Sequence, residues 1–409
     1  MNNLISKFYL HFSFLIAKIY VKCAPMYKRA ILFSNFDGKG FGCNPKYIAM
    51  YIHEHHLPFE MFWRVRDMEI AKTLPDYVKP IINGTAKDFV YTRLAHFYIH
   101  NSRVFIADNR KKGQYNIQTW HAIFGYKHAE HAAEDELPVS YIQLAKQHSM
   151  KTDMFIAASN WHEYDYRMNF WYDGEIMESG YPRDDIYFSE DKTLKHNIKM
   201  YLGISDDMKV LIYAPTFRDS GDVTIYHIPI EQIVNSLQQR THEKWAVIVR
   251  LHPNVPVKVK NMFSYNDYII EATTYPDPQE LFYVSDLMIT DYSSTSFDFL
   301  IQKKTVILYA PDYGKKNLRS LNPLFKDIPY PHCYDVNGLL QVIESFDENE
   351  LENKMKDFLT SYKGENGEPF VSFDNGHAAE KIVERIQQVM DGKIKTLRQL
   401  GRALSFKEA

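Results

Sequence analysis

The feature of this sequence that most constrains the fold is a series of short, unbroken apolar runs separated by longer stretches with helical spacing. Strands that are apolar on both faces are typical of parallel sheets covered by helices on each side. The runs lie at residues 30–33, 61–63, 104–106, 155–157, 210–213, 246–249, 287–289 and 306–308. Helical stretches between consecutive strands imply right-handed crossovers. The sequence therefore predicts an α/β protein built from parallel sheets.

The chain is long enough for two such sheets. It has 409 residues, 45% of them hydrophobic, which suits two domains with separate cores. A polar, charged stretch at 189–207 indicates a crossing between the domains. We expect an N-terminal segment over 1–29, Rossmann-like domains over 30–200 and 201–390, and a C-terminal segment over 391–409. Ligands of open α/β sheets bind beyond the carboxyl ends of the strands, so a cleft between the two domains is the expected site.

The bulk composition argues against several classes of protein. The net charge of −3 gives no nucleic-acid signature. Cys23, Cys43 and Cys333 lack the spacing of metal ligands, which argues against a disulfide framework or a zinc site and fits a reducing cytoplasm. The sequence contains no Asp-x-Asp, no Walker-type loop and no Gly-x-Gly-x-x-Gly. We therefore expect neither a metal-clamped diphosphate, nor a nucleoside triphosphatase, nor a dehydrogenase.

Both termini are basic. No acidic residue precedes Asp37, and lysines flank an apolar, aromatic run at 8–21. That run is too short and interrupted to span a bilayer securely, and it lacks a signal-peptide cleavage site. It is expected to form a helix that lies in the membrane interface or one that packs on its own domain. The stretch 391–409 alternates Lys and Arg with Ile and Leu. It is predicted to be a helix, lying either on anionic lipid or in solvent.

In the second half, polar residues follow the predicted strands. Ser293 and Ser294 stand between a strand and an apolar helix, where hydroxyls and helix N–H groups could hold phosphate. The alternative for Ser293 is an ordinary N-cap. Arg250 and His252 follow the strand at 246–249. His252 either donates to a phosphate oxygen in the transition state or has a structural role.

Two further segments carry candidate residues. Thr216 and Arg218 follow the strand at 210–213, and Arg218 could fork onto phosphate or pair with Asp219. Tyr181 and Pro182 lie in a predicted tight turn after a strand at 175–178. These two residues are expected to line the cleft together with Asp219, or only to form the turn.

In the first half, His121 ends the segment Gln118-Thr119-Trp120-His121. A histidine with an ordinary pKa near neutrality suits a general base for a hydroxyl. The chain has 17 histidines, so this residue alone is weak evidence.

Taken together and in this order, the motifs resemble the CDP-glycerol glycerophosphotransferase family of teichoic acid primases and polymerases and their capsule relatives. The resemblance runs from about residue 35 to about residue 385. Its anchors are Gln118-Thr119-Trp120-His121, Gly180-Tyr181-Pro182-Arg183, Tyr213-Ala214-Pro215-Thr216 with Arg218-Asp219, Arg250-Leu251-His252-Pro253 and Thr290-Asp291-Tyr292-Ser293-Ser294. The segments Cys43-Asn44-Pro45-Lys46 and Asn375-Gly376-His377-Ala378 also look familial.

The resemblance implies a GT-B architecture, in which two Rossmann-like domains face each other and the second holds a cytidine nucleotide. His121 would be the base on the acceptor hydroxyl. The donor side implied by the resemblance comprises His252, Arg218, Thr216, Arg250, Ser293, Ser294, Asp291 and Glu280. His252 and Arg218 would stabilise the diphosphate and the departing CMP. Asp291 and Glu280 would orient the serine loop or meet ribose hydroxyls.

The implied reaction transfers glycerol phosphate or ribitol phosphate from a CDP-activated donor. The implied acceptor is a lipid-linked saccharide or a growing polymer at the inner face of the cell membrane, with no metal and no tightly bound cofactor. One departure leaves polyol and acceptor open: the family usually continues Trp-His with Gly-Thr-Pro and a lysine, whereas here the chain reads Ala122-Ile123-Phe124-Gly125-Tyr126-Lys127. The alternatives are a GT-B glycosyltransferase that uses a nucleotide sugar and a non-catalytic scaffold that binds anionic glycans or lipid.

Overall fold

The computed structural model describes residues 2–122, 125–218, 222–252, 254–315 and 321–400. The contacts among the residues divide the chain into two compact units. Unit one comprises residues 1–121, 130–185 and 373–409, and unit two comprises 122–129 and 186–372. Each unit is built on one parallel sheet, which confirms the prediction of an α/β protein with two parallel sheets.

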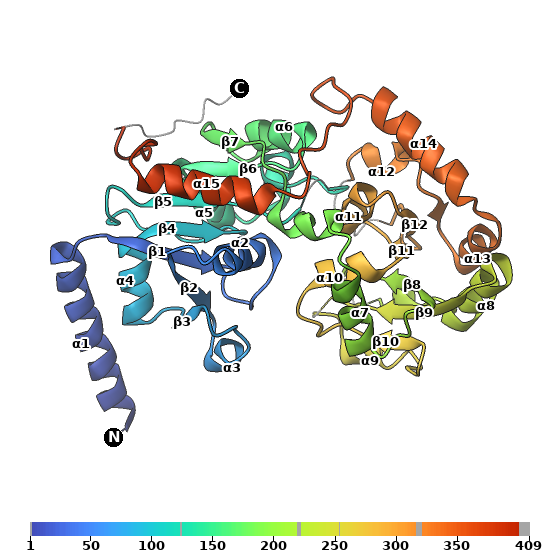
Figure 1. The fold of residues 1–409 in the computed structure, drawn as a ribbon, viewed down its shortest axis with the longest axis horizontal. Coiled ribbons are helices and arrows are strands. Elements are labelled where there is room, and N and C mark those ends of the chain that lie inside the picture. The colour runs from blue at the N-terminus through green and yellow to red at the C-terminus, as the bar shows by residue number, and fades with distance from the viewer. Residues whose placement is uncertain (1, 123–124, 219–221, 253, 316–320, 401–409) are drawn as a thin grey trace. The chain divides into compact units, whose positions relative to one another are not determined.

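Unit one contains a seven-stranded sheet in the order β3-β2-β1-β4-β5-β6-β7, with every neighbouring pair parallel (Figure 1). The strands are β1 (Tyr27–Ser34), β2 (Glu60–Val65), β3 (Lys79–Ile82), β4 (Ala95–His100), β5 (Tyr115–Gln118), β6 (Met154–Ile156) and β7 (Glu175–Met177). The apolar runs at 30–33 and 61–63 are confirmed as parts of β1 and β2, and the run at 155–157 overlaps β6, which ends at Ile156. Their side chains are buried because helices cover both faces of the sheet.

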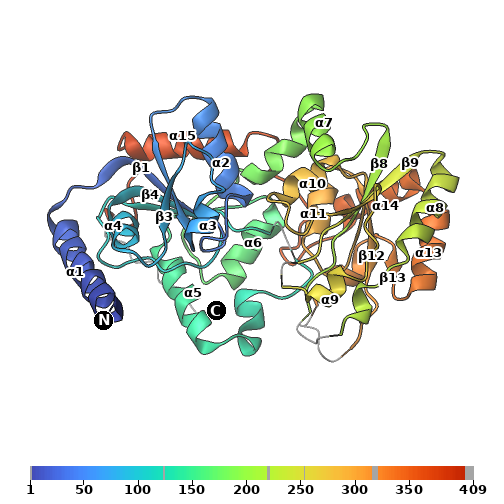
Figure 2. The ribbon, with the colours of Figure 1, turned by 90° about the horizontal axis from the view of Figure 1, so that it is seen from below.

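The helical segments of unit one connect these strands. They are α1 (Asn2–Cys23), α2 (Cys43–Glu54), α3 (Met68–Ala71), α4 (Ala86–Leu94), η1 (Glu130–Glu136), α5 (Val139–Lys151), α6 (Asn160–Asn169), η2 (Pro182–Phe188, which ends in unit two) and α15 (Ala378–Met390). In both views α1 runs beside α4 (Figures 1 and 2). Val21 and Ala24 of this N-terminal segment pack with Leu94 of α4.

The strand predicted at 104–106 is wrong. This segment has no strand pairing, although Val104 and Ile106 are buried and Phe105 is exposed. The neighbouring strand is instead β4, whose sequence Ala-His-Phe-Tyr-Ile-His contains two histidines and is buried at every position. An imidazole placed in a core interrupts the apolar run by which a buried strand is recognised.

Unit two contains a six-stranded parallel sheet in the order β10-β9-β8-β11-β12-β13. The strands are β8 (Met208–Tyr213), β9 (Lys244–Val249), β10 (Ile269–Glu271), β11 (Leu287–Thr290), β12 (Thr305–Tyr309) and β13 (His332–Cys333). The helical segments are α7 (Lys192–Tyr201), η3 (Thr224–Tyr226), α8 (Ile230–Thr241), α9 (Val257–Lys260), α10 (Pro278–Val284), α11 (Thr295–Ile301), α12 (Leu324–Asp327), α13 (Val336–Ser345) and α14 (Glu348–Ser361). All four apolar runs predicted in this half are confirmed as strands.

The helix α15 lies in unit one, whereas the boundaries expected from the sequence put it in the second domain. Its buried face, which includes Ile382 and Ile386, packs beside α2. Asp185 accepts hydrogen bonds from the first backbone N–H groups of α15, at 2.9 and 2.8 Å. These long-range contacts cannot be read from local composition.

The C-terminal segment also differs from the expectation of a helix. Its described part, residues 391–400, consists of turns and irregular chain. Thr396 is buried and donates its hydroxyl to the carbonyl of Lys112 at 2.9 Å, and the backbone N–H of Leu397 donates to Asp153 at 2.7 Å. These hydrogen bonds hold the segment to the body of unit one.

Candidate functional site

In unit two, three predicted motifs follow strands that are neighbours in the sheet. The order β9-β8-β11 brings together the loops that begin at Arg250, Ala214 and Asp291. Because the strands are parallel, all three loops lie at the carboxyl edge, where open α/β sheets bind their ligands. The motifs are therefore brought together within this unit as the sequence predicted.

Arg218 is held between two carboxylates. Its Nη2 donates to Asp291 Oδ2 at 2.7 Å, and its Nε donates to Asp312 Oδ2 at 2.7 Å. Nη2 also reaches Asp312 Oδ1 at 3.2 Å, and Nη1 donates to the carbonyl of Thr216 at 2.7 Å. The guanidinium stacks 4.9 Å from the ring centre of Tyr292. Arg218 thus ties together the loops that follow β8, β11 and β12.

This geometry engages the guanidinium of Arg218, which was expected to fork onto phosphate, with protein oxygens. A guanidinium has five N–H donors, and four contacts to protein oxygens occupy most of them. The two aspartates also outweigh its charge, which leaves the cluster net negative. The alternative partner suggested by the sequence, Asp219, lies outside the described residues.

Asp291 and Thr216 belong to the same cluster. Asp291 accepts from the backbone N–H of Thr216 at 3.0 Å and also from its hydroxyl. The Asp291 side chain is 5% exposed. Of the two roles considered for Asp291, this arrangement favours orienting the loop over meeting a ribose hydroxyl.

Ser293 and Ser294 stand at the start of α11 and are half-buried. The N-cap residue is Ser294, and its side chain makes no capping hydrogen bond. The Ser293 hydroxyl lies 3.0 Å from that of Thr295 and accepts from the Thr295 backbone N–H at 3.3 Å. Ser293 is therefore not the N-cap residue of α11, although its hydroxyl accepts from the first backbone N–H of the helix.

Arg250, His252 and Glu280 have different surroundings. Arg250 is half-buried, and its Nη1 donates to the carbonyls of Ala272 and Tyr275 at 2.8 and 2.9 Å. Glu280, in the first turn of α10, accepts from the hydroxyl of Tyr275 at 2.6 Å. Burial lowers the pKa of Arg250, but a guanidinium stays protonated at physiological pH.

His252 is exposed beyond the end of β9. Its ring centre lies 5.5 Å from that of Phe217, in the neighbouring loop. The Asn254 backbone N–H lies 3.2 Å from Nδ1, which accepts this hydrogen bond in the neutral ring. A neutral His252 therefore carries its proton on Nε2, the tautomer that a donor to phosphate requires.

In unit one, His121 lies just beyond the carboxyl end of β5, next to β4. Its Nδ1 is 2.6 Å from the carbonyl oxygen of Asn101, the residue that follows β4. A carbonyl only accepts, so Nδ1 carries the proton and Nε2 keeps its lone pair. Phe36 and Trp120 contact the ring, with centre-to-centre distances of 4.9 and 4.5 Å. The ring therefore has one nitrogen set to receive a proton.

The pKa of His121 differs from the ordinary value expected from the sequence. Burial lowers it to about 4, and the positive charges of Arg183 and Lys39 act in the same direction. The imidazole is therefore neutral throughout the physiological range. The ring can accept a proton at physiological pH because it is unprotonated. Its low pKa also makes it a weak base.

Asn101 was not identified by sequence reasoning, although it acts directly on His121. Its side chain accepts from the Phe36 N–H at 2.7 Å and donates to Asn35 at 2.8 Å. Asn35 in turn donates to the carbonyl of Gly40 at 3.1 Å. The sequence signal for this residue was an Asn directly after β1 and another directly after β4. It was not recognised because β4 was not predicted as a strand.

Tyr181 and Pro182 do not line an open surface. Tyr181 is fully buried, and its hydroxyl lies 3.1 Å from Nε2 of His162. Pro182 is buried at the start of η2. The turn needs Gly180, whose φ is +80° and whose added Cβ would lie 2.7 Å from a side-chain oxygen of Asp374. The turn interpretation of this motif therefore holds.

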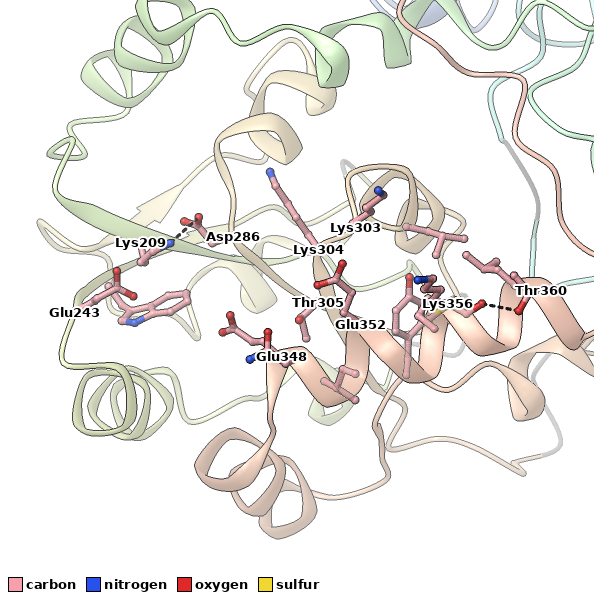
Figure 3. Close-up of a pocket in the computed structure, with 17 residues that line it drawn as sticks. Lys209, Glu243, Asp286, Lys303, Lys304, Thr305, Glu348, Glu352, Lys356 and Thr360 are labelled. Atoms are coloured by element: carbon pink, nitrogen blue, oxygen red, sulfur yellow. Dashed lines mark hydrogen bonds and ion pairs between the residues drawn. The ribbon is translucent and has the colours of Figure 1, made fainter.

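A cavity of about 600 Å³ lies at the amino ends of the strands of the unit-two sheet (Figure 3). Lys209, Trp245 and Thr305 line it from the first residues of β8, β9 and β12, and one face of α14 lines it as well. Figure 3 shows Glu352 extending into this space from α14. None of the predicted site residues lines this cavity. The cavity therefore lies at the amino ends of the strands, whereas the loops that begin at Ala214, Arg250 and Asp291 lie at the carboxyl ends.

Within the described ranges, no group of three or more His, Cys, Asp or Glu side chains is arranged to hold a metal ion.

Comparisons with known proteins give the family. The family model for CDP-Glycerol:Poly(glycerophosphate) glycerophosphotransferase matches residues 16–388. The chain is 26% identical over 400 residues to a teichoic acid poly(glycerol phosphate) polymerase of Bacillus spizizenii, a match that covers 93% of this chain and 99% of the relative. A protein of the same name from Staphylococcus epidermidis is 26% identical over 377 residues, covering 88% of this chain. This chain spans about half the length of that relative, 50%.

Solved structures agree with this result. A variant of the wall teichoic acid polymerase TagF superposes with a TM-score of 0.78 at 25% identity, and the alignment covers 93% of each chain. The family model extends over both units, from α1 to α15. The chain therefore belongs to the CDP-glycerol:poly(glycerophosphate) glycerophosphotransferase family.

Proposed function

We propose that this protein transfers glycerol phosphate or ribitol phosphate from a CDP-activated donor to an acceptor hydroxyl, with release of CMP. The acceptor is the terminal hydroxyl of a lipid-linked saccharide or of a growing teichoic acid or capsule polymer. The observation that carries this proposal is the match of residues 16–388 to the family, with the motifs at the carboxyl edges of two parallel sheets. Those edges are where such folds bind ligands.

In the proposed reaction, the acceptor oxygen attacks the phosphorus that bears the polyol. A new P–O bond forms, the P–O bond to CMP breaks, and the hydroxyl proton passes to Nε2 of His121. The hydrogen bond from Nδ1 to Asn101 supports this role, because it keeps the lone pair on Nε2. The negative diphosphate of a bound donor raises the pKa of a nearby imidazole and so strengthens the base.

The proposed donor side uses groups at the carboxyl ends of neighbouring strands of the unit-two sheet. Arg250, the hydroxyls of Ser293 and Ser294, and His252 contact the diphosphate and the departing CMP. Arg218 is assigned a positioning role, because its N–H groups are already donated to Asp291, Asp312 and Thr216. Positioning and charge stabilisation supply most of the rate in phosphoryl transfer.

We also propose that the two units face each other in the GT-B manner. Unit one then presents the acceptor base, and unit two binds the CDP-polyol. The segment 122–129, which follows His121 directly, belongs to unit two. In unit two, Ser296 donates its hydroxyl to that of Tyr126 at 2.9 Å. The base and the serine loop are thus connected by a few residues of chain.

The test is CMP release by the purified protein. It is supplied in turn with CDP-glycerol, CDP-ribitol and several nucleotide sugars, each with and without a membrane extract as acceptor. We expect acceptor-stimulated CMP release from one CDP-polyol, which also identifies the polyol. Release of nucleotide only from a nucleotide sugar would replace the proposal with glycosyl transfer on the same scaffold. No release from any donor would favour a binding role.

Removing both serine hydroxyls is expected to weaken donor binding. In the variant Ser293→Ala with Ser294→Ala, the donor KM should rise roughly 10²- to 10⁴-fold, because two hydrogen bonds to a charged group are lost. The control variant Ser345→Ala with Ser361→Ala removes two exposed helix hydroxyls of the same unit. Equal donor KM values in the two variants would mean that the serine loop only starts a helix.

We further propose that α1 rests on the inner face of the cell membrane. Within the described residues, no helix is both long and apolar enough to cross a bilayer. One side of α1 packs on unit one, and Phe14 lies 5.9 Å from Phe89 of α4 between ring centres. The other side exposes large hydrophobic side chains, namely Tyr9, Phe12, Leu15, Ile16, Ile19 and Tyr20. An apolar stripe beside Lys18 and Lys22 suits an interface with anionic lipid.

Placing charges on this stripe is expected to release the protein from lipid. The variant Phe12→Glu, Ile16→Glu, Ile19→Glu should partition more than about 100-fold less onto anionic vesicles in a flotation assay, since three large side chains no longer bury in lipid. The control is Met68→Glu, Val139→Glu, Met150→Glu, which changes three exposed hydrophobic residues elsewhere in unit one. Equal loss of partition in both variants would contradict a specific role for α1.

A further inference from the structure

The buried amide of Asn44 holds the backbone of the loop that carries His121. Asn44 is the second residue of α2 and has no exposed surface. Its Nδ2 donates to two successive carbonyls, of Thr119 at 3.0 Å and of Trp120 at 3.1 Å. Its Oδ1 accepts from the backbone N–H of Arg183 at 3.1 Å. Both N–H donors and the acceptor oxygen of the amide are therefore engaged.

Arg183 holds the next carbonyl of the same loop. Its Nη1 donates to the carbonyl of His121 at 2.8 Å. The side chain is buried, and its guanidinium lies 5.5 Å from the ring centre of Tyr181. The backbone of Arg183 binds Asn44 while its side chain binds His121. Three consecutive carbonyls, from 119 to 121, are thus held by two side chains from distant parts of the chain.

The loop needs such support because Trp120 has an unfavourable backbone. Its φ is +51°, in the left-handed region that a bulky side chain rarely adopts. Strain of this kind costs about 1–3 kcal/mol and persists only where the surroundings determine the conformation. Without its hydrogen bonds, the loop would relax toward an ordinary conformation and turn the imidazole away from its present direction.

We propose that Asn44 and Arg183 are positioning residues that hold His121 in the orientation required for attack by the acceptor hydroxyl. The inference rests on the proposed function, in which His121 is the base. Neither residue contacts the donor or the reacting atoms in this scheme. A displacement of a catalytic group by about 1 Å can lower a rate about 100-fold, so a defect in positioning appears in kcat.

The competing explanation is that these hydrogen bonds only stabilise unit one. The chain offers a matched control in Gln114, a buried amide whose Nε2 also donates to two carbonyls, those of Thr92 at 3.2 Å and Ala95 at 2.9 Å. Gln114 precedes β5, at the edge of the sheet opposite to His121. Gln114→Ala and Asn44→Ala therefore delete similar bonds at opposite ends of one strand.

The experiment compares Asn44→Ala, Asn44→Asp and Arg183→Lys with Gln114→Ala and the wild type. Asn44→Asp keeps the volume and the acceptor but cannot donate to the two carbonyls. Arg183→Lys keeps the charge and the backbone N–H but loses the planar fork. For each variant we would measure kcat and donor KM for CMP release, and hydrogen exchange of the segment 118–122.

We expect the Asn44 and Arg183 variants to lower kcat roughly 10- to 100-fold. Donor KM should stay within about threefold of the wild-type value, and exchange of the loop should accelerate. Gln114→Ala should leave kcat and loop exchange unchanged, even if its melting temperature falls equally. A kcat in the Asn44 variants no lower than in Gln114→Ala would overturn the inference, whatever the exchange shows.

Failure of the proposed function would look different. A wild-type protein that releases no CMP from any donor would refute the transfer reaction. Hydrogen exchange of the segment 118–122 would then test whether Asn44 and Arg183 hold this loop. Faster exchange in the Asn44 and Arg183 variants alone would support that role, and unchanged exchange would refute it.

Discussion

His121→Ala is expected to lower kcat for acceptor-dependent CMP release by about 10²- to 10⁴-fold, the range for removal of a general base. The donor should bind almost normally, because the proposed donor contacts lie in unit two and His121 lies in unit one. Residual transfer should remain, since electrostatic stabilisation by the donor-side groups does not depend on the imidazole.

The measurement combines steady-state kinetics with direct titration of the donor. His131→Ala is a suitable control, because His131 is an exposed histidine of the same unit, paired with Glu134. A His121→Ala protein with normal kcat would remove this residue from the mechanism. Normal kcat at saturation with a large loss of donor affinity would instead assign His121 to donor binding.

The stability of unit one is expected to fall steeply as the pH drops from 7 to 5. His100, His148 and His162 are buried almost completely. Burial lowers the pKa of His100 to about 3, and it also lowers the pKa of His148 and of His162 well below the ordinary value. The positive charge of Arg103 acts in the same direction on the pair His100 and His148.

The sign follows from proton binding. In the unfolded chain these imidazoles bind protons below about pH 6.5, whereas in the folded chain they stay neutral, so acid favours the unfolded state. Stability is fully present above pH 6.5 and is lost as the pH falls from there toward the folded pKa values. At pH 5 the neutral imidazole of His100 costs about 2 kcal/mol, and His148 and His162 act in the same direction.

Urea unfolding at several pH values, followed by tryptophan fluorescence, measures this effect, since Trp63, Trp120, Trp161 and Trp171 belong to unit one. The variant His100→Leu removes one of the three groups, so the loss between pH 7 and pH 5 should shrink by about 2 kcal/mol. His55→Leu, at an exposed position, should leave the pH dependence unchanged. An unchanged pH dependence in His100→Leu would show that His100 is protonated in the folded protein over the same pH range as in the unfolded chain.

Most of the fold could be predicted because its signals are local. A buried parallel strand such as 210–213 is a continuous apolar run, and the turn at Gly180 requires a residue without a side chain. Two of the strands that were missed carry polar residues into the core: β4 buries His96 and His100, and β5 buries Asn116 and Gln118. Burial of those imidazoles depends on helices and strands far away in the chain, which no local pattern contains.

The candidate site divides along the same line. The order of the motifs and their places after strands were sufficient to identify the family and to bring Arg250, Asp291 and Ser293 to one edge of a sheet. The sequence could not show which hydrogen bonds each side chain makes or how its pKa is shifted. Arg218 donates a hydrogen bond to Asp312, 94 residues away in the sequence, and the pKa of His121 is set mainly by burial. Local spacing specifies which residues reach an edge of the sheet, whereas only contacts between distant segments decide which of their polar atoms remain available for a ligand.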